Sequence, residues 1–364
     1  MHRRSLAGRL TPLALLVLQL AAFPAASPAA DKAQLQLAVK GVAAYPAYVA
    51  KHLEYFAEEG LDVEVVSGTC HHLPHVCRAS TALVQQVSSG TTLIGWGVPA
   101  AVLPAVERGE RLKFFYTYGV RSFFDVVVPD ASPIKTVADL RGKTVGITDR
   151  RYGEVAFVRA VLATASLRPG DDVTTVVIDH RAPQVLASLR DGAVQAVGGS
   201  VEELAALARA GFNVRSLSGE YGELPSSGIF VTEKTFHERR EQLAKVGRAV
   251  ARATLFALTN PPAAASIMAR MVPAQFQSNE SGRTLLGTYL ALSTPSRRDD
   301  RGELVFGAAM PGGWARLRTL ALLGGSPVGD RPADLDTVVT GELIPEVNRF
   351  DREKVRQQAR AARP

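Results

Sequence analysis

The amino-acid sequence predicts an α/β protein of two lobes that are joined by two chain crossings. Short apolar strands alternate with amphipathic helices from residue 35 to about residue 120, as expected for a parallel sheet covered by helices. The alternation breaks twice, because a strand at 121–129 follows the strand at 112–118 directly, and a strand at 228–232 follows a loop. The chain therefore leaves a first lobe, builds a similar second one and returns. This arrangement gives a hinge and a cleft that can close around a solute.

The first βαβ unit begins the first lobe. Alternating apolar residues predict a strand at 35–39, a helix follows at 46–60, and a second strand at 63–66 completes the unit. A parallel unit of this kind has a right-handed crossover. Ligands in open α/β sheets bind beyond the carboxyl ends of the strands, so Tyr45 and Thr69 are expected at a binding edge.

The same patterns predict the remaining elements. In the first lobe we expect a helix at 81–87, a strand at 93–96, a helix at 99–109 and a strand at 112–118. In the second lobe we expect strands at 121–129, 145–147, 173–178, 193–197 and near 214, and helices at 136–142, 153–167, 182–190 and 201–210. After the strand at 228–232 the pattern is helical at 233–258, 262–271, 282–292 and 309–323. The first lobe should then comprise residues 31–121 and 228–364, with a fraying tail after residue 352, and the second residues 122–227.

Residues 1–30 have the features of an export signal. Arg3, Arg4 and Arg9 precede an apolar stretch at 10–23, and small residues allow cleavage after Ala29 or Ala30. The stretch is too short for a membrane anchor, and we find no later apolar segment that could span a bilayer. We therefore expect an exported protein, periplasmic where the cell has two membranes. The sequence does not decide between export by the general secretion pathway and export by the twin-arginine pathway.

Composition and motifs argue against nucleic-acid binding and against catalysis. The formal net charge of +7 is spread along the chain, whereas a nucleic-acid binder would be expected to concentrate it in a patch. Gly142-Lys143-Thr144 lacks the earlier Gly of a phosphate-binding loop, and the loose dinucleotide pattern at 95–100 contains Pro99. His237-Glu238 lacks the second His of a zinc protease. We therefore expect no cofactor, no metal and no enzymatic activity.

Several segments resemble one family of solute-binding proteins. They read AYPAYVAKHLEYFAEEGLDVEVV, SPIKTVADLRGKTVGI, LASLRDGAVQAVGGSVEE and PSSGIFVTEKTF, in this order. The sequence is similar in these places to the nitrate/sulfonate/taurine binders, a family that also includes the thiamine-pyrimidine-precursor binders. The resemblance implies a type II periplasmic-binding-protein fold, in which each lobe holds a mixed, mostly parallel sheet. It also implies a monomer that delivers a small molecule to a membrane ABC permease.

The segment from Cys70 to Cys77 departs from this family. It carries the only two Cys residues of the chain and three of its seven His residues. An even Cys count in an exported chain favours a disulfide between Cys70 and Cys77. Cys and His side chains also suit zinc or copper, and a Cys helped by His71 can act as a nucleophile. The alternatives are therefore an enzyme on the same fold that uses Cys70 and His71, or a solute-sensing receptor.

Loops at the strand ends of both lobes should line the cleft. The candidate ligand-binding residues are Tyr45, Thr69, Trp96, Gly97, Tyr118, Arg121, Arg150, Tyr152, Gly153, Gly199, Ser200, Glu202 and Ser226. The rings of Tyr45, Trp96 and Tyr152 can stack on a flat ring. Arg150 or Arg121, with helix N–H groups at Gly153 and Ser200, can receive a sulfonate or carboxylate. These residues favour a small organic anion as the solute, and an aromatic or pyrimidine-like solute is one alternative. Glu202 can instead face an amine group of the solute.

Overall fold

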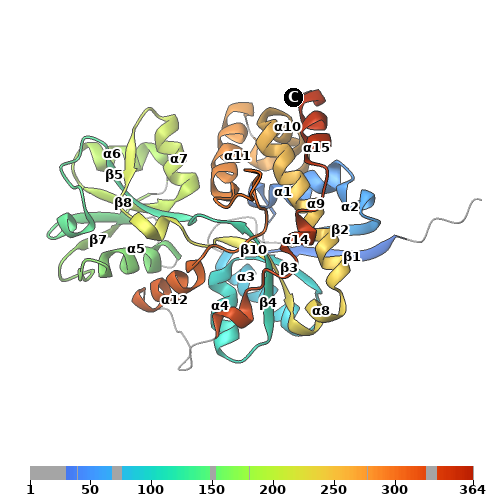
Figure 1. Cartoon of the computed structure of the whole chain (residues 1–364). Helices are drawn as coiled ribbons and strands as arrows, with labels where there is room; N and C mark the ends of the chain where they lie inside the picture. Colours follow the sequence, from blue (N-terminus) through green and yellow to red (C-terminus); the bar gives the residue numbers. More distant parts are fainter. Residues whose placement is uncertain are drawn as a thin grey trace, which may run out of the picture.

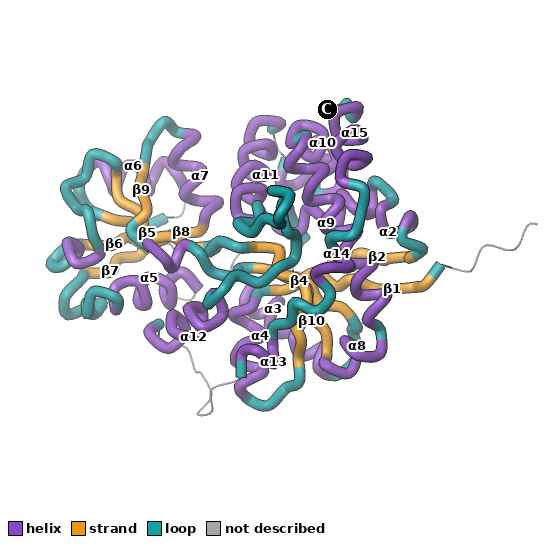
Figure 2. The backbone as a smooth tube through the Cα atoms, viewed as in Figure 1, coloured by secondary structure: helices purple, strands orange, loops and turns teal. Residues whose placement is uncertain are grey.

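The structure is a computed structural model that describes residues 30–38, 40–67, 76–147, 153–179, 181–276, 278–324 and 334–363. Two five-stranded sheets lie side by side, each covered by helices (Figure 1). Figure 2 shows the two groups of strands and the loops that connect them. This arrangement confirms the predicted two-lobe α/β fold.

The first sheet has the order β2-β1-β3-β10-β4. Its strands are β1 (Asp31–Leu37), β2 (Leu61–Ser67), β3 (Ile94–Gly97), β4 (Leu112–Gly119) and β10 (Ser227–Thr232). β1 pairs in parallel with β2 and β3, whereas β10 runs antiparallel to both β3 and β4. The carboxyl ends of β1 to β4 therefore lie at one edge of the sheet, together with the start of β10.

The second sheet repeats this pattern with the order β7-β6-β8-β5-β9. Its strands are β5 (Phe124–Pro129), β6 (Thr144–Ile147), β7 (Thr174–Val177), β8 (Ala196–Ser200) and β9 (Val214–Ser216). Here β5 is the strand that runs antiparallel to its neighbours β8 and β9. In each sheet the antiparallel strand is the one that the chain enters from the other lobe, as the two breaks in the alternation predict.

The helices cover both sheets and fill the carboxyl-terminal third of the chain (Figure 1). They are α1 (Tyr45–His52), α2 (Tyr55–Glu58), α3 (Val76–Ser88), α4 (Pro99–Glu107), α5 (Gly153–Ala163), α6 (Ala182–Arg190), α7 (Val201–Arg209), α8 (Glu233–Glu238), α9 (Arg240–Thr259), α10 (Pro261–Met271), α11 (Asn279–Ser293), α12 (Gly313–Leu323), α13 (Leu335–Val338), α14 (Ile344–Val347) and α15 (Arg352–Ala361). Short 3₁₀ helices lie at Val42–Ala44, Val137–Leu140, Gly219–Gly222 and Pro273–Gln275. None of the helices among the described residues has the length and apolarity that a membrane span requires.

Three expectations about helices are wrong. The helix predicted at 233–258 is divided at Arg239 into α8 and α9. The helix predicted at 46–60 is broken into α1 and α2, because Glu54 adopts a left-handed conformation with φ of 58°. The tail after residue 352 does not fray but forms α15, which the Asp351 carboxylate caps by accepting a bond from Lys354 N at 2.9 Å. Val355 and Ala359 of α15 are buried in the core of the first lobe.

The two crossings run side by side between the sheets. The N–H of Ser122 donates to the carbonyl of Gly222 at 2.9 Å, and the N–H of Ser226 donates to the carbonyl of Gly119 at 3.0 Å. The N–H of Val120 donates to the carbonyl of Leu292, at the end of α11, at 2.9 Å. The hinge is therefore a hydrogen-bonded pair of segments braced by α11.

Helix α12 contacts the cores of both lobes. Leu317 and Leu320 belong to the apolar core of the second sheet, beside α5 (Figure 1). Trp314 packs edge-on against Phe114 of the first lobe, with ring centroids 5.0 Å apart. The lobe boundaries expected at 121/122 and 227/228 stay a prediction, and they do not anticipate that α12 bridges the lobes.

Candidate functional site

Three aromatic rings meet at the carboxyl edge of the first sheet. Trp96 lies near the end of β3, Tyr118 near the end of β4, and Tyr45 begins α1. The Tyr118 ring lies 5.0 Å from the ring of Trp96 and 5.8 Å from that of Tyr45, between centroids. All three residues are buried. The structure thus brings these three predicted site residues together, and we call them the ring cluster.

Two side-chain hydrogen bonds hold the ring cluster in place. The indole Nε1 of Trp96 donates to the hydroxyl of Ser227 at 2.9 Å. The hydroxyls of Tyr45 and Ser293 lie 3.0 Å apart, within hydrogen-bonding distance. Both serines come from elements that follow the second lobe in sequence, β10 and α11. The orientation of the rings therefore depends on segments beyond the return crossing.

Three buried hydroxyl groups near this edge have no hydrogen-bond partner among the described residues. They belong to Tyr48, Tyr118 and Ser226. Ser226 lies directly against Gly119, because a Cβ atom added at Gly119 would overlap its Oγ. Leaving a buried hydroxyl without a partner costs about 1–3 kcal/mol. Such groups therefore need an explanation, and a bound polar molecule is one.

Burial raises the pKa of the phenols at this edge. It raises the pKa of Tyr118 well above the ordinary value, and the neighbouring Tyr45 raises it further. Burial also raises the pKa of Tyr48 to about 12. At neutral pH this edge therefore presents rings and neutral hydroxyl groups.

Glu202 joins the second lobe to the first. It lies in the first turn of α7, and its Oε1 accepts a hydrogen bond from the hydroxyl of Tyr289 on α11. Burial raises the pKa of the Glu202 carboxyl, the bond from Tyr289 opposes this shift, and the nearby Glu203 carboxylate adds to it. The ring of Phe123, in the first crossing, packs edge-on against Tyr289 at 5.7 Å between centroids.

Ser200 serves as the cap of α7. Its N–H donates to Glu203 Oε2 at 2.8 Å, and its hydroxyl donates to the same oxygen at 3.0 Å. The Glu203 carboxylate thus occupies the donors that were expected to receive an anion from the solute. The expectation of free donors at Ser200 is therefore wrong, and its structural role is to begin the helix.

The other predicted residues lie in varied places. Gly97 ends β3, but a Cβ atom there would meet Phe230 at 3.0 Å and Leu83 at 3.5 Å, on the face that packs against α3. Gly199 pairs with Asp125 in the second sheet. Arg121 is exposed in the first crossing. Their roles in binding stay predictions.

Several predicted residues lie outside the described residues. These are Thr69, Cys70, Arg150 and Tyr152, and for Cys77 and Gly153 only the backbone is described, in α3 and α5. The disulfide, metal and nucleophile hypotheses for the Cys70 segment therefore stay open. Among the residues that are described, no group of three or more His, Cys, Asp or Glu side chains could hold a metal ion.

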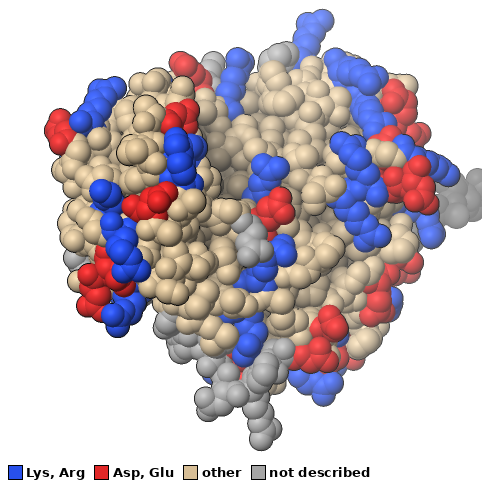
Figure 3. Space-filling model, turned by 60° about the vertical axis from the view of Figure 1, so that its left-hand side comes forward, with Lys and Arg blue, Asp and Glu red and all other residues tan. Residues whose placement is uncertain are grey.

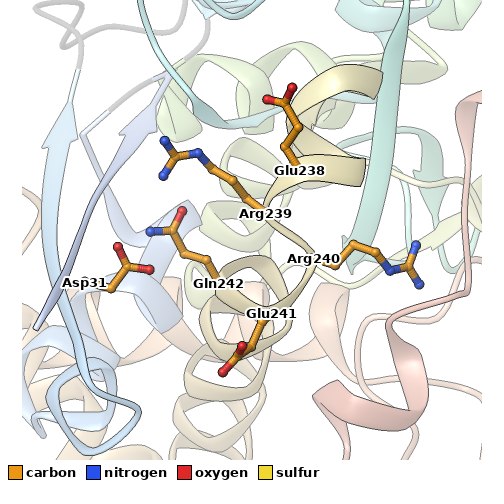
Figure 4. A pocket seen from close by; sticks show the side chains of 6 residues that line it. All are labelled: Asp31, Glu238, Arg239, Arg240, Glu241 and Gln242. Carbon is orange, nitrogen blue, oxygen red and sulfur yellow. The ribbon is translucent and has the colours of Figure 1, made fainter. Parts of the chain in front are cut away.

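Two surface pockets lie at the opposite edge of the first sheet. One, of about 370 Å³, is lined by Asp31 and residues 238–242, and Figure 4 shows Arg240 pointing away from Asp31. The other, of about 800 Å³, includes Leu112 and Thr232, which pair at the start of β4. Both pockets are open and mainly lined by charged and polar residues, and neither contacts the ring cluster.

Charge is mixed on the face of the molecule shown in Figure 3. Lys and Arg side chains alternate there with Asp and Glu. Opposite charges also pair within the described residues, as Arg248 does with Glu59 at 2.6 Å and Arg318 with Glu107 at 2.8 Å. On this one face, therefore, basic and acidic side chains are interspersed.

Sequence reasoning missed several residues of this edge. Tyr48 lies three positions after Tyr45 on the same helix, a spacing that places both on one face. Tyr289 and Ser293 contact the predicted residues Glu202 and Tyr45 directly. Nothing in the sequence of α11 indicates that it reaches the carboxyl edge of a sheet it does not follow.

Comparison with known proteins identifies the family. The family model described as NMT1/THI5 like matches residues 43–264. The riboflavin-binding protein RibY of Chloroflexus aurantiacus is 26% identical over 333 residues, which are 89% of this chain and 91% of RibY.

Solved structures share the fold. The aliphatic sulphonate-binding protein SsuA of Escherichia coli aligns with a TM-score of 0.60 at 15% identity, over 86% of this chain and 92% of SsuA. DSZB in complex with biphenyl-2-sulfinic acid aligns with a TM-score of 0.55 at 16% identity, over 88% of this chain and all of DSZB. Since the family model covers more than half of the sequence, the chain belongs to the NMT1/THI5-like family.

Proposed function

We propose that this protein is an exported solute-binding protein that captures a small organic solute between its lobes and presents it to a membrane ABC permease. The observation that carries the proposal is the ring cluster with the unpartnered hydroxyls of Tyr118 and Ser226 beside it. These groups lie where the two crossings join the lobes, at the edge where α/β sheets bind ligands. RibY and SsuA are named as binding proteins, which supports the same proposal.

The solute should carry a flat ring with polar substituents. Aromatic side chains favour stacked or edge-on contact with such a ring, and the buried hydroxyls can bond its polar atoms. Riboflavin is the first candidate, because RibY is named for it. Sulfonates, aromatic carboxylates and pyrimidines follow, with Arg150 or Arg121 as the group that would receive an anion. We infer a periplasmic location, because SsuA, which shares the fold, is named as a periplasmic binding protein. We also propose that the protein is a monomer.

Removing the unpartnered hydroxyls tests this proposal. We expect Tyr118→Phe and Ser226→Ala each to weaken solute binding roughly tenfold, because each removes one hydrogen bond to the solute. The solute-free variants should melt no lower than the wild type, because these hydroxyls have no partner among the described residues. A thermal-shift screen with riboflavin, sulfonates, aromatic carboxylates, pyrimidines and nitrate selects the solute, and calorimetry measures its affinity.

Tyr55→Phe is the matched control for these variants. Its hydroxyl bonds Gln358 of α15 at 2.8 Å, within the first lobe and among elements that do not form the ring cluster. We expect it to lower the melting temperature and leave affinity unchanged. Wild-type affinity in both Tyr118→Phe and Ser226→Ala would contradict the proposed site.

An enzyme on the same fold is the second candidate. The likeness to DSZB, solved with biphenyl-2-sulfinic acid, is the observation that favours it. Cys70→Ser and Cys77→Ser separate the two functions. An enzyme that uses Cys70 would lose turnover of an aromatic sulfinate, whereas a binding protein would lose at most stability or affinity.

A further inference from the structure

We infer that the hydrogen bond from Tyr289 to Glu202 holds the two lobes together, and that α11 couples this contact to the ring cluster. The inference deepens the proposed function and rests on it for the role of the solute. Figure 1 shows α7 of the second lobe and α11 of the first facing each other. Tyr289 is a positioning residue, because it affects solute binding by holding the two lobes together and not by contacting the solute.

The contact joins elements of different lobes. α7 follows β8 of the second sheet directly, whereas Tyr289 is 5% exposed and is part of the apolar core of the first lobe. Val201, the first residue of α7, also packs against that core. The start of α7 is therefore docked on the first lobe by an apolar side chain and a hydrogen bond next to it.

The first crossing fixes this docking site from a second direction. The N–H of Val201 donates to the carbonyl of Phe123 at 2.9 Å. The Phe123 ring in turn packs edge-on against Tyr289, 5.7 Å away. Rotation of the lobes about the crossing would therefore separate Glu202 from Tyr289.

The pair can set the balance between joined and separated lobes. Hydrogen bonds to charged groups are about twice as strong as neutral ones, and burial excludes competing water. On the order of a tenfold change in the equilibrium between joined and separated lobes is expected when the hydroxyl is removed.

Helix α11 links this contact to the ring cluster. Tyr289 and Ser293 lie one turn apart on it, and the Ser293 hydroxyl donates to the carbonyl of Tyr289 at 2.8 Å. The same hydroxyl lies 3.0 Å from that of Tyr45. A solute that orders Tyr45 thereby orders the turn that carries Tyr289. The solute then favours joined lobes because it contacts them better than separated ones.

Tyr289→Phe tests the inference in two independent measurements. In the solute-free variant we expect faster amide hydrogen exchange at residues 201–204, since the start of α7 loses its partner on α11. With riboflavin as the probe, we expect dissociation to be roughly tenfold faster and association little changed, because most effects of such variants appear in dissociation. In a double-mutant cycle, Glu202→Ala should add little further change to Tyr289→Phe.

Thr288→Val is the matched control. Its hydroxyl bonds the carbonyl of Thr284 at 3.1 Å, within α11 itself, so neither exchange at α7 nor dissociation should change. Unchanged exchange at residues 201–204 in Tyr289→Phe would overturn the inference, whether or not riboflavin binds. Failure of riboflavin and the other screened compounds to bind the wild type would instead count against the proposed function, while the exchange result would still decide the lobe contact.

Discussion

Gly228→Ala is expected to destabilise the protein by about 3 kcal/mol or more, which places it among the most damaging single substitutions. Gly228 lies in β10, between β3 and β4. A Cβ atom there would overlap both the Phe114 ring and the carbonyl oxygen of Tyr116. The backbone oxygen cannot move without breaking the pairing of β4. Guanidinium denaturation, followed by circular dichroism, measures the change.

Gly287→Ala is the control for this substitution. Gly287 is exposed on α11, and an added Cβ atom would meet nothing within 4 Å. Ala is the better helix former by about 1 kcal/mol, so this variant should be as stable as the wild type or more so. Equal stability of Gly228→Ala and Gly287→Ala would contradict the packing of β10 described above.

Trp96→Ala is expected to abolish solute binding and to destabilise the protein by about 3–5 kcal/mol. The substitution removes the ring that packs against Tyr118 and the indole N–H that donates to Ser227. Both the proposed stacking surface and the support of the ring cluster are lost. Calorimetry at a temperature well below melting measures affinity, and denaturant titration measures stability.

Trp314→Ala separates the two effects. Trp314 is also buried, 5% exposed against 3% for Trp96, and it packs against Phe114 away from the ring cluster. We expect a similar loss of stability and an affinity within about threefold of the wild type. Because affinity is measured on folded protein, an equal loss of binding in both variants would contradict the ring cluster as the binding site.

The crossings could be predicted because they change the order of elements, and that order is visible in the sequence. A strand at 124–129 directly after one ending at Gly119 cannot continue a β/α alternation. The break between α1 and α2 could not be predicted in this way. Tyr55 and Phe56 continue the apolar pattern, and neither Gly nor Pro marks the left-handed residue Glu54. Tertiary packing of α2 decides the local conformation there.

The carboxyl-terminal helix α15 was not predicted, for a different reason. Residues 352–361 carry many charges, so a solvated segment was the natural expectation. Val355 and Ala359 nevertheless lie four residues apart and form a narrow apolar face that α9 covers. The Asp351 cap adds a start signal that was present in the sequence.

Some residues of the candidate site could be predicted from the sequence, and others could not. Tyr45, Trp96 and Tyr118 could be predicted together, because strand ends in a parallel sheet meet at one edge. Tyr289 and Ser293 could not, because α11 reaches that edge through packing between elements distant in sequence. The prediction of free hydrogen-bond donors at Ser200 was wrong, because Glu203 in the same helix accepts the hydrogen bonds from its N–H and hydroxyl groups.

The most direct test of the central proposal uses the two Trp residues of the chain, Trp96 and Trp314. Labelling with 5-fluorotryptophan gives one ¹⁹F resonance for each, and Trp314→Phe assigns them. Addition of the solute selected by the thermal-shift screen should shift the Trp96 resonance and leave that of Trp314 in place. A shift of Trp314 alone, with Trp96 unchanged at saturating solute, would contradict binding at the ring cluster.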